Sequence, residues 1–326
     1  MSIDARILQA LRSSSSGSIS GAELSQQLGI SRAAVWARIE ELRRLGYDIE
    51  ASPHQGYRLL KSPDALHADD LTWRLESGRK IGRDIRVFEQ TTSTNDVIEK
   101  LAQDGVPEGI VVFAESQTAG RGRLGRRWVS PARKGLWFSV LLRPNIRPSA
   151  ATQMTVAAAT ALRHAIESET QLKSEIKWPN DILISGKKVA GILTELSAEL
   201  DRVKYLIVGI GVDVNLGPDD LPNELKSQAT SLQIESGKPV ARVELAAAIL
   251  RELEKVYQQV LDGDFATVAD EWEHHCSTLG RRLVIQLGDR RVSGRAEALG
   301  EDGALLLRTE HGHLERIVGG DVQIEK

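Results

Sequence analysis

Residues 120–128 read GRGRLGRRW, and the interpretation of this stretch decides the fold of the central part of the chain. Its three glycines match the pattern G-x-G-x-x-G of a dinucleotide-binding turn. That turn requires a preceding strand, a helix that begins within the motif and an acidic residue about 20 positions later. The preceding run GIVVFAES is typical of a strand, but Pro131 and Gly135 oppose a following helix, and residues 116–166 contain no Asp or Glu. The sequence therefore argues against a doubly wound dinucleotide-binding fold.

The same acid-free window holds nine Lys or Arg residues, four of them in the loop itself. Glycines let the main chain approach a ligand closely, and guanidinium groups match the geometry of phosphate and carboxylate. Trp128, Trp137 and Phe138 follow the arginines and indicate that the loop is anchored over an apolar site. A solvated connection and a patch for single-stranded nucleic acid are the alternatives, although the stacking aromatics of such a patch are not interleaved with these arginines. We therefore predict a site for a small anion.

Length and composition limit the class of protein. A chain of 326 residues suggests two or three domains, and 41% hydrophobic with 27% charged residues is ordinary for a globular protein with a sizeable core. The net charge of −3 does not indicate a nucleic-acid-binding protein, although an average can hide a local patch. Cys276 is the one cysteine, which excludes internal disulfides and is typical of a reducing compartment. No apolar run is long enough for a signal peptide or a membrane span, so we predict a cytoplasmic protein without a membrane partner.

The first 62 residues have the pattern of a winged helix-turn-helix. Three helices are expected: one that ends at the serine run 13–16, one between the capping box Ser20–Glu23 and Gly29, and one that begins at Ser31. The segments YDIEA and GYRLL on either side of SPHQ predict a hairpin wing. The residues that the third helix is expected to bury are Val35, Ile39, Leu42 and Leu45.

The charge of this module is mildly positive. Residues 1–62 hold eight Lys or Arg against six Asp or Glu, a net of +2, and the rest of the chain holds 34 against 39, a net of −5. A helical hairpin of this kind also occurs as a protein-interaction module, so that alternative stays open. The winged pattern together with the third helix favours DNA binding. The predicted DNA-binding residues are Ser31, Arg32, Ala33, Trp36 and Arg38.

Beyond residue 63 strand-like and helix-like runs alternate, which predicts a mixed α/β domain around one sheet. The expected strands are IRVFEQ, GIVVFAES, WFSVLLR, EIKWPNDILI, KVAGILTELS and VKYLIVGIGVDVN. The expected helices are VIEKLAQ, 149–168 and 241–262. His274, His275 and Cys276 are consecutive and cannot easily share one metal ion, so we expect ordinary helix residues there.

A second polar cluster lies in residues 177–193, KWPNDILISGKKVAGIL. Pro179 predicts a turn that places Asn180 and Asp181 near a strand end. ISGKK is typical of a hairpin turn, which would bring Lys188 or its neighbour Lys187 back beside the first strand. A lone K-x-P-N-D is more often a salt-bridged turn, but the arginine loop and the glycines of GIGVD favour a binding site. No Walker A sequence occurs, so any ATP would be held differently.

Taken in chain order, these motifs resemble those of the biotin–protein ligases. The matching segments are STN (93–95), QTAGRGRLGRRW (117–128), KWPND (177–181), KVAGIL (188–193) and GIG (209–211). With the N-terminal module, nearly the whole chain resembles the bifunctional ligases that also repress the biotin operon. The resemblance implies an α+β multidomain fold with a winged helix-turn-helix domain over 1–62 and a mixed α/β ligase domain like class II aminoacyl-tRNA synthetases over 63–278. It also implies an SH3-like β-barrel over 279–326, where LVIQLG, VSGRAEAL and GALLLR are typical of short strands.

The resemblance implies two half-reactions. Biotin and MgATP give biotinyl-5′-AMP and pyrophosphate, and a lysine of the biotin-carrier domain of acetyl-CoA carboxylase then takes the biotin. It also implies a homodimer that binds the operator DNA of biotin genes with biotinyl-AMP as corepressor. A carboxylate that attacks a phosphate brings two anions together, so preorganised cations are needed.

The resemblance also implies residue roles. The implied catalytic residues are Lys188, Arg121 and Arg123. The implied biotin-binding residues are Ser93, Thr94, Asn95, Gln117, Gly120, Arg121, Gly122, Arg123, Trp128, Lys188 and Gly191. The implied ATP-binding residues are Arg126, Asn180 and Asp181, and Asp181 is also the implied Mg²⁺ ligand.

Two positions depart from the family pattern, and three alternatives remain open. Asp213 stands where the family usually has Asn, and Leu124 where a relative carries another Arg. A lipoate ligase shares the ancestral fold, but the arginine loop and the context of Gln117 favour biotin. A ligand-sensing transcription factor with an inactive enzyme domain is the second alternative, against which the intact Lys188 argues. The third is a ligase whose N-terminal module no longer binds DNA.

The glycine-rich loop is expected to be mobile until ligand contacts offset an ordering cost of about 1–2 kcal/mol per residue.

Overall fold

The computed structural model describes residues 2–14, 17–53 and 55–324. Its contacts divide the chain into two compact units, Met1–Gly78 and Arg79–Lys326, and each is described by itself. Residues 63–78 belong to the first unit, since Asp70 of α4 (Ala68–Trp73) is 1% exposed and forms ion pairs with Arg12 and Arg74. The compact unit thus extends past residue 62. The end of the DNA-binding domain at residue 62 remains a prediction.

Besides α4, the first unit has three helices and a hairpin among its described residues: α1 (Ile3–Ser13), α2 (Gly21–Leu28), α3 (Arg32–Arg44), β1 (Asp48–Ser52) and β2 (Gly56–Lys61). The predicted caps are confirmed. The Ser20 and Ser31 hydroxyls accept hydrogen bonds from Glu23 N and Ala34 N, and Gly29 is left-handed with φ 69°. These local interactions place α2 and α3 around a short turn, as in a helix-turn-helix.

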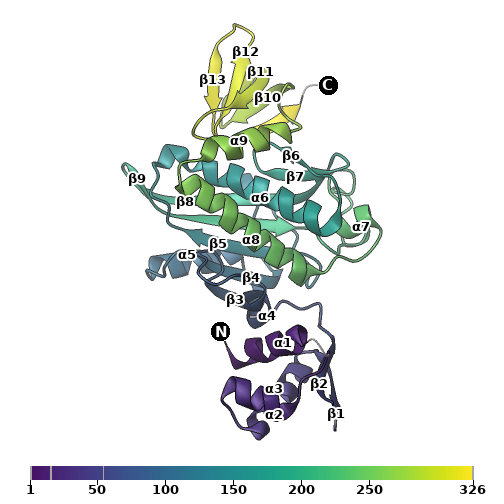
Figure 1. The fold of residues 1–326 in the computed structure, drawn as a ribbon. Helices are drawn as coiled ribbons and strands as arrows, with labels where there is room; N and C mark the ends of the chain where they lie inside the picture. The colour runs from purple at the N-terminus through teal and green to yellow at the C-terminus, as the bar shows by residue number, and fades with distance from the viewer. Residues whose placement is uncertain (1, 15–16, 54, 325–326) are drawn as a thin grey trace. The chain divides into compact units, whose positions relative to one another are not determined.

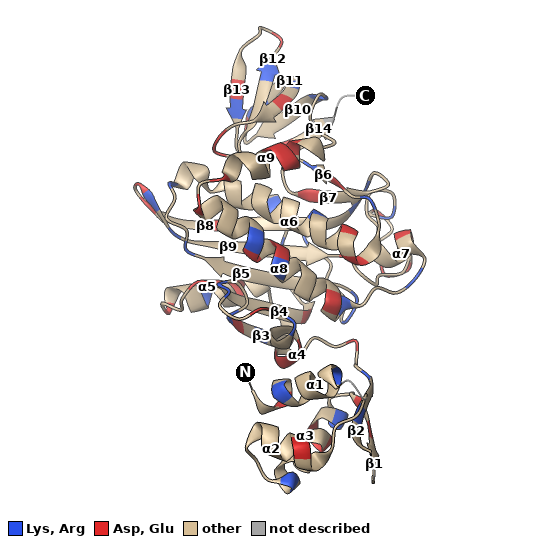
Figure 2. Ribbon diagram, viewed as in Figure 1, with Lys and Arg blue, Asp and Glu red and all other residues tan. Residues whose placement is uncertain are grey.

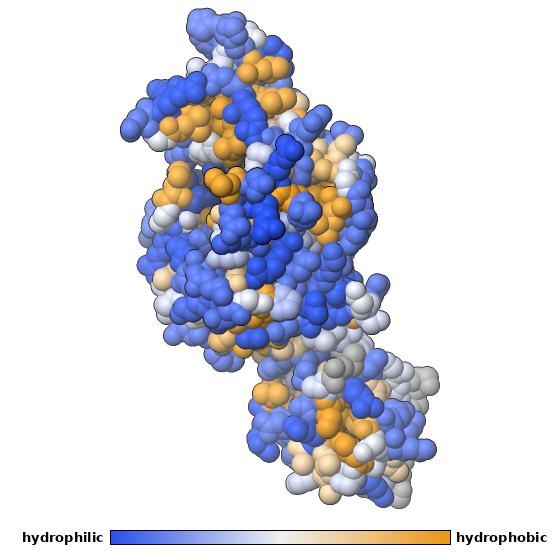
Figure 3. Space-filling view, turned by 90° about the vertical axis from the view of Figure 1, so that its left-hand side faces the viewer, coloured by the Kyte–Doolittle hydropathy of each residue, from blue (hydrophilic) through white to orange (hydrophobic). Residues whose placement is uncertain are grey.

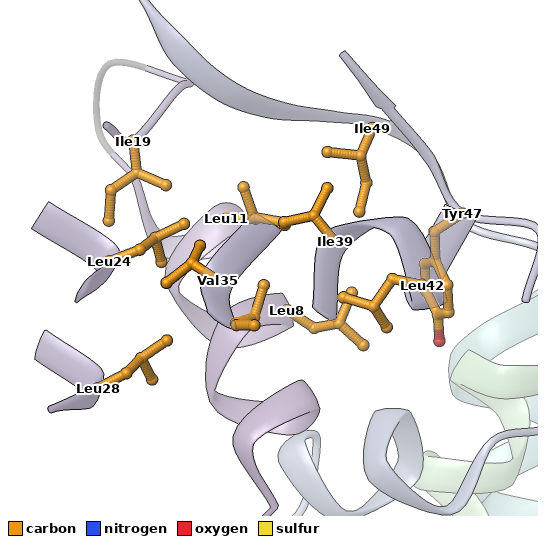
Figure 4. Close-up of a cluster of buried hydrophobic side chains, with 11 residues drawn as sticks. Leu8, Leu11, Ile19, Leu24, Leu28, Val35, Ile39, Leu42, Tyr47 and Ile49 are labelled. Carbon is orange, nitrogen blue, oxygen red and sulfur yellow. The ribbon is translucent and has the colours of Figure 1, made fainter. Parts of the chain in front are cut away.

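One apolar core holds this unit together (Figure 4). Its buried side chains include Leu8, Leu11, Ile19, Leu24, Leu28, Val35, Ile39, Leu42, Tyr47 and Ile49. The prediction that α3 also buries Leu45 was wrong, because the helix ends at Arg44 and Leu45 is its C-cap, 41% exposed.

Within the described part of the second unit, seven strands form the central sheet in the order β3-β4-β5-β9-β8-β7-β6 (Figure 1). Only β3 and β4 pair in parallel, and the other neighbours are antiparallel. The strand that follows the glycine–arginine loop thus returns beside the strand before it, which confirms that this is no dinucleotide-binding turn. The strands are β3 (Asp84–Thr91), β4 (Ile110–Gln117), β5 (Leu136–Leu142), β6 (Glu175–Lys177), β7 (Asp181–Ile184), β8 (Lys187–Glu199) and β9 (Arg202–Val212).

Helices cover both faces of the sheet. On one face α6 (Thr152–Thr170) and α8 (Arg242–Leu261) lie side by side (Figure 1). On the other face α5 (Thr94–Gln103) buries Ile98 against Leu141 and Ile207. Because strand side chains alternate between faces, the odd-numbered residues of β5 share the α5 face. The other described helices of the second unit are η1 (Arg123–Gly125), η2 (Pro148–Ala150), α7 (Leu232–Ser236) and α9 (Phe265–His274).

The C-terminal strands form a separate antiparallel sheet within the second unit. Over the described residues its order is β13-β12-β11-β10-β14. The small C-terminal β domain is thereby confirmed, although the sequence indicated only three of these strands. The bounds are β10 (Arg282–Leu287), β11 (Arg290–Leu299), β12 (Leu305–Thr309), β13 (Leu314–Ile317) and β14 (Asp321–Ile324). Figure 3 shows hydrophobic side chains gathered over this sheet, above a mostly hydrophilic central surface.

Two negative findings concern the described residues. None of the described helices is long and apolar enough to span a membrane. Among the residues that the structure describes, no three His, Cys, Asp or Glu side chains gather as a metal site would require. His274 ends α9 and His275 follows it as the C-cap, so only His274 is a helix residue.

Candidate active site

A pocket of about 650 Å³ lies over the central sheet on its α5 side. It collects segments that are far apart in the sequence, from α5, the glycine–arginine loop, the β7–β8 hairpin and β9. The predicted ligand residues among its lining are Ser93, Thr94, Asn95, Gln117, Arg121, Gly122, Arg123, Arg126, Trp128, Asn180, Asp181, Lys188 and Gly191. The structure therefore brings these side chains together, and their individual roles remain predictions.

One end of the pocket is uncharged and polar. Gln117 Oε1 accepts from Thr94 N at 2.9 Å, and Gln117 Nε2 donates to Ser130 Oγ at 3.0 Å. Gly120 lies behind this end, because Trp128 N donates to its carbonyl and a Cβ there would meet Trp128 O at 2.7 Å. Donors and acceptors without charge are what a cyclic urea requires.

Sequence reasoning missed two polar partners of α5. The hydroxyl of Ser139, which is fully buried in β5, lies 2.7 Å from Thr94 Oγ1 and donates to Asn95 Oδ1 at 2.5 Å. Glu195 of β8 accepts from Asn95 Nδ2 at 2.7 Å. The available signals were a serine inside the apolar run LWFSVLL and a glutamate inside KVAGILTELS.

The floor of the pocket is built from glycine. Gly191 of β8 pairs with Gly211 of β9, and the indole of Trp128 lies against both. A Cβ on Gly211 would approach Trp128 Cε2 to 2.6 Å, and one on Gly191 would approach Trp128 Cζ3 to 2.9 Å. Trp137 holds the indole edge-on, with ring centroids 6.4 Å apart. The two glycines thus make room for a flat aromatic wall.

The other end of the pocket carries the predicted hairpin lysine. The β7–β8 hairpin pairs Lys188 with Leu183, which confirms that ISGKK turns the chain back. Lys188 Nζ lies 2.6 Å from Asp181 Oδ1 and 5.0 Å from the centroid of the Trp128 ring. The ammonium is thereby held between a carboxylate and the aromatic wall.

Two loop arginines make different contacts. Arg121 donates to Asp96 Oδ1 at 2.5 Å and to Glu195 Oε1 at 3.4 Å, and the hydrogen bond to Asp96 raises the pKa of Arg121. Arg123 donates to Asn180 Oδ1 at 3.2 Å, and burial lowers its pKa against the opposing charge of Asp181. Arg123 is thus positioned by a side chain of the pocket lining, and Arg121 by two carboxylates beside it.

The C-terminal sheet also contributes to the pocket, which the sequence did not indicate. Arg126 forms an ion pair with Asp321 of β14 at 2.6 Å, and Arg123 Nη2 donates to Gly320 O at 3.3 Å. Gly320, Asp321 and Val322 line the pocket. The glycine–arginine loop is therefore attached to the C-terminal sheet, whereas its tip residue Leu124 is 68% exposed.

Asp213 is a carboxyl group buried in the pocket lining, with 7% of its surface exposed. Burial raises its pKa to about 8, while the positive charge of Lys188 opposes the shift. A neutral carboxyl group at this position has the size of the asparagine that the family pattern favours.

We expect Asp213→Asn to stabilise the protein more at high pH than at low pH. Since the folded-state pKa of about 8 exceeds the ordinary aspartate pKa of 3.8, the contribution of Asp213 to the wild-type free energy of unfolding falls as the pH rises through that interval. Asparagine does not ionise, so the advantage of the variant should grow by about 2 kcal/mol between pH 6 and pH 8. Urea unfolding at both pH values measures this, and a pH-independent difference would contradict it.

The predicted DNA-binding residues lie in the first unit, and the structure separates one of them from the others. Arg32, Ala33 and Trp36 share an exposed face at the start of α3, and Trp36 is 58% exposed. Ser31 caps the helix. Arg38 lies on another face, 3.7 Å from Asp4 of α1, because six residues turn a helix well past that first face. Figure 2 shows acidic and basic residues interspersed along the ribbon of this unit.

The fold agrees with the known proteins that the chain resembles. The family model described as the biotin/lipoate A/B protein ligase family matches residues 87–215, an HTH domain model matches 5–58, and the biotin protein ligase C-terminal domain matches 278–324. These define a biotin or lipoate ligase joined to a helix-turn-helix domain.

Whole-chain relatives narrow this class. The chain is 40% identical over 94% of its length to the bifunctional ligase/repressor BirA of Bacillus subtilis, of which it covers 94%. It is 28% identical to the protein of that name from Escherichia coli, with 94% and 92% of the two chains covered. It also resembles the biotin protein ligase from Aquifex aeolicus solved in complex with biotin and ATP, with a TM-score of 0.63, 31% identity, and 75% and 99% of the chains covered. The chain belongs to the family of bifunctional biotin–protein ligase/repressors.

Proposed function

We propose that this pocket joins biotin to AMP and then passes the biotin to a lysine of the biotin-carrier domain of acetyl-CoA carboxylase. The single observation that carries the proposal is the order of the lining. An uncharged polar end at Thr94 and Gln117 leads over a glycine floor to the cations Lys188 and Arg123. Biotin has the same order, with a ureido ring, an apolar body and a carboxylate.

The reaction balances in two steps. A biotin carboxylate oxygen attacks the α-phosphorus of ATP, the bond to the β-phosphate oxygen breaks, and pyrophosphate leaves. The acceptor lysine, as the neutral amine, then attacks the carbonyl carbon, the bond to the phosphate oxygen breaks so that AMP leaves with the bonding pair, and the nitrogen gives up one proton to solvent. In the first step Lys188 and Arg123 offset the charge that gathers where the carboxylate meets the phosphate. Closure of the loop over the adenylate protects the mixed anhydride from water.

The residues present fit a magnesium ion that enters with ATP. Mg²⁺ is commonly held by one or two carboxylates together with substrate phosphates. Asp181 supplies a carboxylate in the pocket, beside the ammonium of Lys188. Asn180 has a different task, since it donates to Ile192 O at 2.7 Å and accepts from Arg123, so it positions the arginine. When bound, the ion would neutralise phosphate charge.

We expect the protein to exchange pyrophosphate into ATP only when biotin is present, with Mg²⁺ in the assay. Carboxylate activation is reversible, so labelled pyrophosphate should appear in ATP in a biotin-dependent way. Lipoate at the same concentration serves as the control, because it has the carboxylate but no ureido ring. Exchange with lipoate and none with biotin would overturn the substrate assignment.

The second activity is repression of biotin genes, with biotinyl-AMP as corepressor of a cytoplasmic homodimer. In this proposal the glycine–arginine loop becomes ordered when the adenylate binds, and the ordered loop forms part of a dimer surface. Adenylate binding then strengthens dimerisation, and dimerisation strengthens adenylate binding by the same factor. Two winged helices on a palindromic operator would double the phosphate contacts of a module whose charge is only +2.

We expect Arg32→Ala to weaken operator binding about tenfold and to leave pyrophosphate exchange unchanged. Arg32 is exposed at the start of α3, the part of a recognition helix that meets base edges. Arg86→Ala on β3 removes the same charge outside the module and serves as the control. DNA titration and sedimentation at fixed salt, with and without biotin and ATP, measure both effects. A protein that stays monomeric, with unchanged DNA affinity, would leave only the ligase activity.

A further inference from the structure

A chain of hydrogen bonds runs under the uncharged end of the pocket. It begins at Glu195 on β8, passes through the amide of Asn95 and the hydroxyl of Ser139, and ends at the hydroxyl of Thr94. The three inner residues are buried, and Thr94 and Asn95 line the pocket. Space for the amide exists because Gly209 has no side chain, since a Cβ there would lie 2.3 Å from Asn95 Oδ1.

The direction of every bond in this chain follows from Glu195. A carboxylate accepts hydrogen bonds, so the amide of Asn95 must present Nδ2 to it and Oδ1 to Ser139. The amide oxygen is also an acceptor, so Ser139 must give it its one hydroxyl hydrogen. The 2.7 Å contact between Ser139 and Thr94 then requires Thr94 to be the donor.

The hydroxyl of Thr94 is left with lone pairs only. Its hydrogen is directed to Ser139 at 2.7 Å, so the longer hydrogen bond from Thr94 Oγ1 to Gln117 Oε1, at 3.3 Å, is only a weak second branch. Gln117 Oε1 accepts its shorter hydrogen bond from Thr94 N. We propose that Glu195 is a positioning residue that makes Thr94 an obligate acceptor, which selects a ligand N–H over a ligand oxygen. This inference rests on the proposed function, in which a ureido ring occupies this end.

The substitution Glu195→Gln should reverse the direction of the hydrogen bonds between Asn95, Ser139 and Thr94. Glu195 faces two donors, because Oε2 accepts from Asn95 and Oε1 accepts from Arg121 at 3.4 Å. Glutamine has only one oxygen, and the charged guanidinium is the stronger partner for it. Its amide NH₂ then faces Asn95, whose own amide must turn. Ser139 would receive a hydrogen bond from Asn95, donate to Thr94, and leave Thr94 as a donor.

The test compares biotin with its two cyclic carbamate analogues, in each of which one ring N–H is replaced by oxygen. The dissociation constants are measured by calorimetry on the full chain. The analogue that the wild type rejects more strongly identifies the N–H that faces Thr94, and its dissociation constant should exceed that of biotin by about 100-fold or more. In Glu195→Gln this ratio should fall at least tenfold. Glu199→Gln, on the same strand with exposed partners Lys204 and Arg202, should keep the wild-type ratio.

Ser139→Ala provides a second and independent variant. It removes the acceptor of the Thr94 hydrogen without touching Glu195, so the ratio should again fall. A merely structural effect would weaken both ligands in parallel and leave the ratio unchanged. The inference is overturned if either variant keeps the wild-type ratio. If wild-type protein binds no biotin at all, the proposed function fails instead, so the two failures are distinguishable.

Discussion

Replacement of Lys188 by glutamine is expected to slow the formation of biotinyl-AMP by about 10²–10³-fold. The ammonium lies in the pocket, 2.6 Å from Asp181, and we propose that the attacking carboxylate and the α-phosphate meet there. Its charge matters most as phosphate charge develops, so the rate constant should fall more than the affinity for biotin. The side chain is 31% exposed, so the fold should lose little stability.

Single-turnover adenylation measures this effect, and Lys187→Gln is the matched control. Lys187 precedes Lys188 on β8, so strand alternation directs the two side chains to opposite faces. The control should keep a rate within about twofold of the wild type, as expected for a surface change away from the site. A folded Lys188→Gln protein with unchanged adenylation would remove this lysine from the chemistry.

Gly211→Val is expected to weaken biotin binding about 100-fold, which is the upper range for overpacking a well-filled site. The first added carbon would lie 2.6 Å from Trp128, whose indole is held by Trp137. The backbone of Gly211 does not itself require glycine, since its φ is not positive. The effect should therefore arise from the pocket wall and not from strain in β9.

Calorimetric titration with biotin and with ATP separates this effect from a general loss of structure. Gly217→Val is the matched control, because the nearest atom to a Cβ there is Asp220 Oδ2 at 3.5 Å. Biotin affinity should fall in the first variant and persist in the second, with similar thermal midpoints. Unchanged biotin affinity in a folded Gly211→Val protein would show that Trp128 and the glycine floor do not form the biotin wall.

The features that the sequence predicted well depend on neighbours along the chain. The caps at Ser20 and Ser31 join atoms three residues apart, and the β7–β8 hairpin joins strands across a two-residue turn. Motif order predicted that the candidate ligand residues would share one pocket for a related reason, since the motifs lie in or next to strands of the same sheet. Helix periodicity gave a wrong prediction for Leu45, because α3 ends one residue earlier, at Arg44.

The features that the sequence did not reveal depend on distant partners. Arg126 meets Asp321 from 195 positions away, and Asn95 meets Glu195 from 100 positions away. No local pattern marks such pairs, because they arise only when the sheet is assembled. The raised pKa of Asp213 is of the same kind, since burial causes it and burial depends on the whole fold.

The most direct test of the central claim is chemical detection of the adenylate in the pocket. The protein is incubated with biotin, ATP and Mg²⁺ without an acceptor, quenched in acid, and the released nucleotide is identified by mass spectrometry. We predict close to one biotinyl-5′-AMP per pocket in the wild type, and formation at least about 100 times slower in Lys188→Gln. Absence of biotinyl-AMP from folded wild-type protein that still binds biotin would contradict the claim that this pocket activates it.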